Sequence, residues 1–99
     1  MKVRFLKVAQ EELSEAVRYY ESQVPGLGGD FLLAATAAIE RIMEYPEAWQ
    51  RVDAELRRCR LGKFPYGLIF TAESKELLIV AVPHLHKRPR AWRDRIEDH

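Results

Sequence analysis

Hydrophobic positions in the first half of the chain change from strand spacing to helix spacing. Residues 2–6 alternate polar and apolar side chains, which predicts a β-strand. Over residues 9–23 and 30–44 the apolar positions instead recur every three or four residues, which predicts two amphipathic helices. The segment 25–29, PGLGG, separates them, because proline cannot continue a helix and glycine permits a tight turn. The first half is therefore expected to form a strand and a helical hairpin.

The second half consists of short runs with strand character. Residues 56–61, 65–71 and 77–82 are rich in β-prone side chains, and the polar segment between the last two has the length of a hairpin loop. The last run is apolar throughout, as expected of a well-buried strand. Pro89 is suited to the first turn of a short terminal helix. The order β-α-α-β-β-β predicts an α+β fold in which a helical hairpin covers one face of a small antiparallel sheet.

Length and composition agree with one folded domain. The chain has 99 residues, of which 47% are hydrophobic and 31% charged, which is ordinary for a soluble globular protein. No apolar run approaches the about 20 residues needed to cross a bilayer. The N-terminus lacks the pattern of a secretory signal, and the single cysteine fits a reducing compartment. We therefore expect a single cytoplasmic domain over residues 1–99.

Charge is distributed unevenly along the chain. Residues 1–50 carry five Lys and Arg against eight Asp and Glu, a net charge of −3, whereas residues 51–99 carry eleven against seven, a net charge of +4. The sum is the overall +1. Basic charge is therefore concentrated in the strand-rich half, which favours an anionic partner.

Three segments resemble one family of small proteins. They are AVRYYESQVPGLGGDF (16–31), LRRCRLGKFPYGLIF (56–70) and LLIVAVPHLHKRPRAW (77–92). In their order and spacing they resemble the RelE/ParE superfamily, the toxins of type II toxin–antitoxin modules. The resemblance implies a helical hairpin on a curved antiparallel sheet. It also implies a cognate antitoxin, ParD-like or related, that is small and partly disordered and neutralises the toxin in a hetero-oligomeric complex.

The resemblance leaves three modes of action open. ParE-like members poison DNA gyrase without being enzymes, RelE-like members cut messenger RNA in the ribosomal A site, and a degenerate member retains only antitoxin binding. Trp92 stands where a ribonuclease of this superfamily often has a tyrosine or histidine, and the last tyrosine, Tyr66, belongs to a strand. Because tryptophan cannot transfer a proton usefully, the ParE-like mode is favoured. Whether the toxin is an enzyme stays open.

The arginines of residues 57–60 alternate along a predicted strand. If Cys59 and Leu61 face the helices, Arg58 and Arg60 lie on the open face of the sheet. The planar guanidinium binds phosphate or carboxylate through two parallel hydrogen bonds. The alternative is a solvated sheet face whose charges protect the edge from aggregation.

Two histidines follow the last strand. If that strand continues past Val82, His84 and His86 share one face and could act as acid and base on RNA, since histidine titrates near neutral pH. The alternative is that both merely decorate the strand end. A zinc site needs three or four ligands, so no metal is expected, and no cofactor motif is present. The candidates for target binding or catalysis are Arg58, Arg60, Lys63, His84, His86, Arg88 and Arg90.

The aromatic side chains of the hairpin and the loops have competing interpretations. Tyr19, Leu27 and Trp49 are candidate antitoxin contacts beside the two helices, although each could equally be an ordinary packing residue. Helical spacing puts Tyr20 in the core and leaves Tyr19 nearer the surface. Trp92 is expected to cover the end of the sheet.

Overall fold

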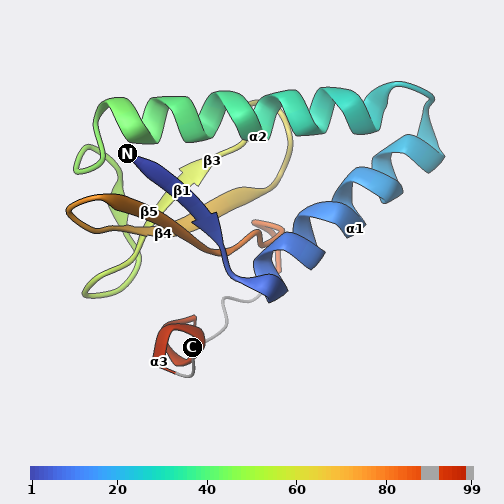
Figure 1. Cartoon of the computed structure of the whole chain (residues 1–99). Coiled ribbons are helices and arrows are strands. Elements are labelled where there is room, and N and C mark those ends of the chain that lie inside the picture. Colours follow the sequence, from blue (N-terminus) through green and yellow to red (C-terminus); the bar gives the residue numbers. More distant parts are fainter. Residues whose placement is uncertain (88–91, 98–99) are drawn as a thin grey trace.

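The computed structural model describes residues 1–87 and 92–97. A helical hairpin lies against a sheet, and a short helix follows at the C-terminal end (Figure 1). The elements are β1 (Lys2–Phe5), α1 (Lys7–Gln23), α2 (Leu27–Glu44), β2 (Gln50–Arg51), β3 (Arg57–Arg60), β4 (Gly67–Ala72), β5 (Glu76–Ala81) and α3 (Arg93–Glu97). The α+β class and the order of the principal elements are confirmed. The strand β2 is an addition that its two residues were too few to indicate.

The sheet is mixed rather than entirely antiparallel. Its strand order is β1-β5-β4-β3-β2. The pairs β2–β3, β3–β4 and β4–β5 are antiparallel, whereas β1 runs parallel to β5, with Val3 opposite Leu77 and Phe5 opposite Ile79. The alternation of side chains in a strand is the same in either direction, so the sequence pattern could not distinguish the two pairings.

The core lies between the hairpin and the two longest strands. Residues 77–82 are all buried, as expected from their continuous apolar run. The helices contribute mainly small side chains to this core: Ala9, Leu13 and Ala16 from α1, and Phe31, Ala35, Ala38 and Ile42 from α2. The small side chains let the helices approach the sheet and each other closely.

Both helices of the hairpin end where predicted but begin earlier. α1 starts at Lys7 and α2 at Leu27, two and three residues earlier than the periodicity indicated. The earlier start of α2 has a local cause, because the Glu21 carboxylate accepts hydrogen bonds from the backbone N–H groups of Gly26 and Gly28. A side chain from α1 thus supplies the cap that the first turn of α2 lacks at its own N-terminus.

Aromatic rings fill the space beneath the hairpin. Tyr20 stacks on Phe31 with ring centroids 5.4 Å apart, and Phe64 meets both rings edge-on. Tyr19 is 56% exposed. The prediction that Tyr20 packs in the core while Tyr19 lies nearer the surface is confirmed.

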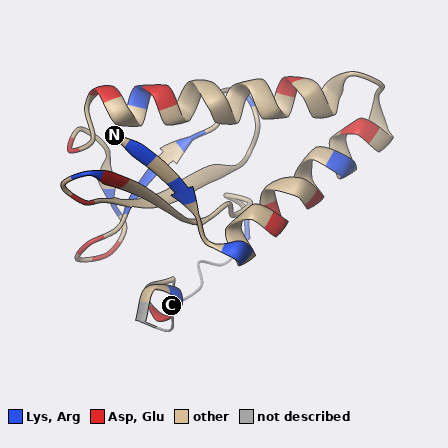
Figure 2. Cartoon of the chain, viewed as in Figure 1, with Lys and Arg blue, Asp and Glu red and all other residues tan. Residues whose placement is uncertain are grey.

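The sign of the charged side chains differs between the helices and two strands of the sheet. Acidic residues predominate along the two long helices, and basic residues mark β1 and β3 (Figure 2). Within the described part of the chain, no helix combines the length and hydrophobicity needed to span a membrane.

Candidate functional site

The segment after β5 forms a turn instead of extending the strand. β5 ends at Ala81, and His84 forms an isolated antiparallel bridge with Tyr66. The chain then turns, with the Lys87 N–H donating to the His84 carbonyl at 3.2 Å. The condition under which His84 and His86 would share one face of a continued strand is therefore not met. The two rings are nevertheless neighbours, with centroids 5.4 Å apart, because the turn folds His86 back over His84.

Tyr66 and His84 form the centre of the candidate site. Their ring centroids are 5.0 Å apart in an edge-to-face arrangement. The sequence pattern puts Tyr66 on one strand and His84 beyond the next, and nothing in it indicates that the two side chains meet. The available signal was the hairpin itself, since residues at similar distances from the loop face each other across antiparallel strands.

Both side chains are electrically neutral near neutral pH. Burial, followed by the nearby charges of His86 and Lys87, lowers the pKa of His84 below 6.5. Burial, followed by Tyr20 and Tyr19, raises the pKa of Tyr66 above 10.0. The His86 N–H donates to His84 Nδ1 at 3.1 Å, so the neutral imidazole carries its proton on Nε2. The site thus offers a tyrosine hydroxyl and an imidazole N–H to a partner.

A groove of about 890 Å³ runs beside these two residues. α1 forms one wall, the segment from Val82 to Lys87 forms the other, and the start of α3 closes one side. Its aromatic lining consists of Tyr19, Tyr20, Tyr66, His84 and Trp92. Such a lining favours a partner segment with large apolar or aromatic side chains.

Arg58 and Arg60 lie on the side of β3 opposite the helices. Cys59 and Leu61 are buried, and Arg41 of α2 contacts Cys59 Sγ at 3.9 Å, so the predicted facing of this strand is confirmed. Arg58 donates to the side-chain oxygen of Gln50 at 3.0 Å, and Arg60 donates to the Gly62 carbonyl at 3.2 Å. Both acceptors are neutral, so these bonds orient the guanidinium groups without neutralising them.

Gly67 brings the basic strand close to the histidine turn. A Cβ atom at Gly67 would lie 3.2 Å from the Leu85 side chain and 3.3 Å from the Arg58 side chain. The side chains of Arg58 and of Leu85, the residue between the two histidines, therefore both border Gly67. Lys63 is exposed on the turn between β3 and β4, shortly before Tyr66. The structure thus gathers Arg58, Lys63, His84 and His86 at one end of the sheet, while Arg88 and Arg90 lie outside the described residues.

The three candidate antitoxin contacts do not form one surface. Tyr19 lines the aromatic groove, whereas Leu27 begins α2 and Trp49 follows its other end. α2 has 18 residues and is therefore about 27 Å long, so its length separates Leu27 from Trp49. Trp49 packs partly buried against the core, and Arg57 donates to its carbonyl at 2.8 Å. Trp92 also packs against the core, as predicted.

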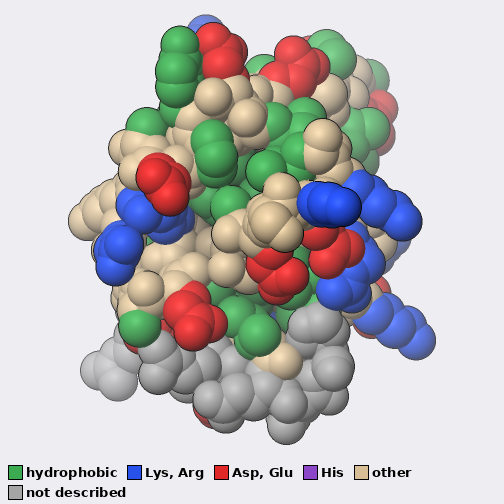
Figure 3. Space-filling model, turned by 60° about the vertical axis from the view of Figure 1, so that its left-hand side comes forward, with side chains coloured by type: hydrophobic (Ala, Val, Ile, Leu, Met, Phe, Trp, Pro, Cys, Tyr) green, Lys and Arg blue, Asp and Glu red, His purple; other side chains and the backbone are tan. Residues whose placement is uncertain are grey.

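A second groove lies at the C-terminal end of α2. It has a volume of about 750 Å³ and is lined by the end of α2, the β2 region and the β4–β5 hairpin loop. Tyr45, 64% exposed, stands at this groove. Figure 3 shows that hydrophobic side chains on this side of the molecule are surrounded by both acidic and basic ones. Neither charge dominates, so this groove indicates no particular ligand.

Titratable side chains do not gather into an evident metal site. Among residues 1–87 and 92–97, no group of three His, Cys, Asp or Glu side chains is placed to hold an ion. Cys59 is buried, and burial raises the pKa of its thiol above 9.0. Such a thiol is a poor nucleophile.

Comparison with known proteins gives the fold and the family. A solved structure described as the chromosomal ParDE TA system from P. aeruginosa resembles the chain with a TM-score of 0.64, covering 87% of this chain and 97% of that one at 16% identity. At this identity the likeness concerns the fold. A comparison with curated proteins found no match. The family model described as the ParE toxin of the type II toxin–antitoxin system parDE matches residues 3–89. Because that match spans most of the sequence, the chain belongs to the ParE toxin family of type II toxin–antitoxin systems.

Proposed function

We propose that this toxin arrests growth in the cytoplasm by poisoning DNA gyrase, and that a small ParD-like antitoxin neutralises it. The observation that carries the proposal is the family match over residues 3–89. Inhibition of gyrase is the action by which ParE-like members block replication. It requires a binding surface but no proton transfer.

The basic end of the sheet is the surface we assign to the target. Arg58, Arg60 and Lys63 present positive charge there, and the hydrogen bonds of the two arginines go to neutral oxygens. An anionic surface on the target would complement this arrangement. The neutral His84 and Tyr66 add hydrogen-bond donors on the side of the sheet that faces α1, so the charged side would steer the target and the other side would add specific contacts.

The aromatic groove beside α1 is the surface we assign to the antitoxin. A disordered segment that folds on binding gains most of its affinity from large apolar anchors. Tyr19 and Trp92 border such a site, and Tyr19 is largely exposed in the toxin alone. The groove is closed at one end by the ion pair between Glu12 and Arg95.

Purified gyrase provides the first test. Supercoiling is measured while increasing amounts of antitoxin-free toxin are added, and the DNA is examined for trapped cleavage. Loss of supercoiling with cleaved DNA is expected. If a demonstrably folded toxin leaves supercoiling unchanged, gyrase is not its target. Premixing with the antitoxin controls for non-specific inhibition, because it should restore supercoiling.

RNA cleavage is a second candidate, favoured by one observation. The sequence argument against it was the absence of a usable tyrosine near the C-terminus, yet Tyr66 lies against His84 with ring centroids 5.0 Å apart. A neutral imidazole could act as a base on RNA, with the Tyr66 hydroxyl beside it. Messenger RNA incubated with ribosomes and toxin tests this function. Cleavage within the A-site codon would favour it over gyrase poisoning.

A growth assay distinguishes a degenerate toxin from a gyrase poison and from a ribonuclease. Replacing Arg58, Arg60, His84 and Arg88 together removes the proposed target contacts. We expect this variant to fold and bind antitoxin but not to arrest growth. A degenerate toxin would leave growth unaffected in the original protein and in the variant alike.

A further inference from the structure

β5 contains an extra residue that changes its pairing with β4. Phe70 is opposite Ile79, but the preceding residue, Ile69, is opposite Ala81. Val80 therefore has no partner on β4 and forms a β-bulge. A bulge of this kind shifts the register of everything that follows it.

The bulge decides which residue faces Tyr66. Without Val80 as an extra residue, the register of β4 and β5 would place Pro83 opposite Tyr66. With it, His84 occupies that position and forms the bridge. The contact between Tyr66 and His84 therefore depends on the one-residue shift in register that the bulge introduces.

The bulge also turns backbone groups of β5 away from β4. Before it, the Glu76 carbonyl accepts the N–H of Glu73 in the hairpin, and beyond it the Pro83 carbonyl accepts the Gly67 N–H. Before the bulge, the backbone groups of β5 that face β4 belong to even-numbered residues, and after it they belong to odd-numbered residues. The Val80 carbonyl and the Val82 N–H consequently point to the other side of β5. β1 cannot bind them, because its pairing with β5 ends at Ile79.

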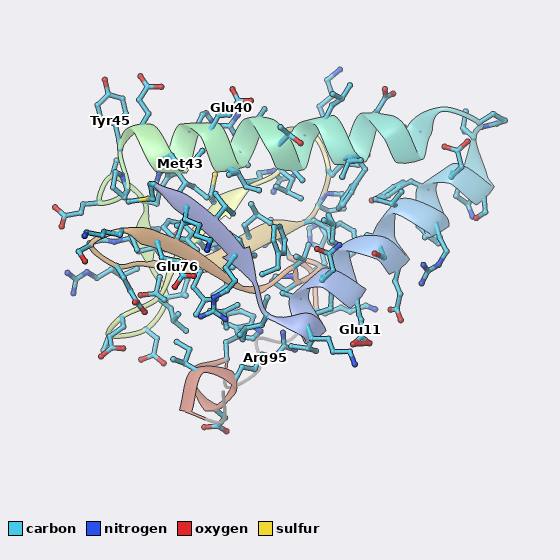
Figure 4. All side chains as sticks on the ribbon, viewed as in Figure 1. Glu11, Glu40, Met43, Tyr45, Glu76 and Arg95 are labelled. Atoms are coloured by element: carbon cyan, nitrogen blue, oxygen red, sulfur yellow. The ribbon has the colours of Figure 1, made fainter. Side chains whose placement is uncertain are left out.

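Two side chains from distant parts of the sequence satisfy these groups. Glu12 Oε1 accepts the Val82 N–H at 3.0 Å, and Arg95 Nη1 donates to the Val80 carbonyl at 3.0 Å. Arg95 also binds Glu12 through both nitrogens, at 2.9 and 3.1 Å. Figure 4 shows Arg95 between α3 and the end of the molecule where α1 begins.

The environment makes this arrangement stronger than a surface ion pair. The side chains of Arg95 and Glu12 are only 20% and 30% exposed, and the pair is bidentate. Charge-assisted, bidentate hydrogen bonds fix geometry as well as adding energy. An ion pair between Arg4 Nε and Glu76 is more exposed, with an arginine side chain that is 44% exposed. It lies at the opposite end of the same strand.

We propose that Glu12 and Arg95 are positioning residues that hold the Val80 bulge in register and thereby keep His84 opposite Tyr66. They act through the β5 backbone and need no contact with the target themselves. The part of this inference that concerns toxicity rests on the proposed function. The part that concerns the position of His84 does not.

NMR of the full chain tests the position of His84. In Arg95→Gln, ring contacts between Tyr66 and His84 should weaken, and the pKa of His84 should move up toward that of an ordinary histidine. Arg95→Lys keeps the charge but not the bidentate geometry, so it should show a smaller change. Arg4→Gln is the matched control, because it breaks an ion pair at the start of β5, far from the bulge, and should leave His84 unchanged.

The unaltered protein supplies a test that does not depend on a variant folding. The Val82 amide has no strand partner, so its exchange with solvent should be slow only if Glu12 holds it. Rapid exchange at Val82 would overturn the proposal. So would unchanged ring contacts and an unchanged His84 titration in a folded Arg95 variant.

Gyrase inhibition completes the experiment. Arg95→Gln should inhibit supercoiling about tenfold more weakly than Arg4→Gln, the effect of losing one well-placed contact. Equal inhibition by the two variants would contradict a positioning role in toxicity. If the NMR changes occur but the original protein itself does not inhibit gyrase, the proposed target is wrong and the positioning role stands.

Discussion

Tyr66 and His84 face each other across a single antiparallel bridge, with ring centroids 5.0 Å apart. One precedes β4 and the other follows β5, so their contact exists only in the folded hairpin. Burial keeps each in its neutral form, and the His86 N–H fixes the tautomer of His84. The pair is thus arranged as a fixed set of hydrogen-bonding groups beside the basic strand.

Acid should weaken the fold through His84. Its pKa is lower in the folded protein than the ordinary 6.5, because burial and then the nearby charges of His86 and Lys87 disfavour the imidazolium form. The unfolded chain therefore binds more protons in the interval between the two values, and stability increases with pH across it. This contribution is complete above pH 6.5 and is lost as pH falls through the folded-state pKa.

Urea unfolding measured between pH 5 and 8 checks this dependence. The original protein should lose more stability on acidification than His84→Gln, which cannot titrate there. His86→Gln keeps the His84 imidazole and the backbone N–H that binds it, so it should retain most of the pH dependence, reduced only by the loss of the His86 charge. Identical pH profiles for the original protein and His84→Gln would refute the assignment.

Replacing the Tyr66 hydroxyl should separate the two candidate activities. Tyr66→Phe keeps the ring that packs against His84 and Phe31 but removes the hydroxyl, which is the part of this side chain able to transfer a proton. Gyrase poisoning should persist in this variant, weakened only by the loss of one neutral hydrogen bond to the target. If the toxin is a ribonuclease, RNA cleavage should fall about 100-fold or more, as expected for the loss of an acid–base group. The two assays on one protein preparation give opposite results for the two mechanisms.

Arg58 and Arg60 of β3 should contribute to inhibition of the target but little to the stability of the fold. Arg58→Gln combined with Arg60→Gln removes two charges whose hydrogen bonds go to neutral acceptors. We expect the free energy of unfolding to change by less than about 1 kcal/mol, while inhibition of the target becomes weaker and less sensitive to salt. Arg18→Gln combined with Lys7→Gln, at two exposed positions of α1, is the matched control, because it also removes two charges. An equal loss of inhibition in the control would show that overall charge, rather than the site, is responsible.

Gly28 should tolerate no larger side chain. A Cβ atom there would lie 2.7 Å from the Val17 carbonyl and 2.9 Å from Glu21 Cβ, so the two helices would have to separate. Gly28→Ala is expected to lower stability by about 1–3 kcal/mol through this overpacking. Gly29→Ala is the control, because nothing lies within 4 Å of a Cβ atom at that position. Thermal unfolding of the two variants should show a clear drop in Tm for the first alone.

The Glu21 cap of α2 should be worth a measurable part of the hairpin's stability. Its carboxylate accepts three hydrogen-bond contacts at 3.0–3.1 Å from the backbone N–H groups of Gly26 and Gly28. Glu21→Ala leaves these groups to water and is expected to cost about 0.5–2 kcal/mol. Urea unfolding checks the value, with Glu11→Ala as an exposed control on the same helix. If Glu21→Ala and Glu11→Ala have nearly the same free energy of unfolding, the Glu21 side chain does not act as a stabilising cap.

The sequence by itself determined the local elements and their order. Periodicity separated the helical hairpin from the strands, and PGLGG marked the turn between the helices. Alternation in β3 correctly placed Cys59 and Leu61 inside, because burial imposes a period of two on a strand. The family resemblance also came from the sequence alone, since it depended on segments whose order and spacing are one-dimensional properties.

Only the tertiary structure decided the relations between distant segments. The parallel pairing of β1, the bulge at Val80 and the Glu12–Arg95 pair join residues from opposite ends of the chain, and local patterning carries no record of them. The same reason explains the separation of Leu27 and Trp49 by the length of α2, and the unpredicted contact of Tyr66 with His84. Hydrophobic periodicity reports which face of an element is buried, whereas register and docking depend on which element is buried against it.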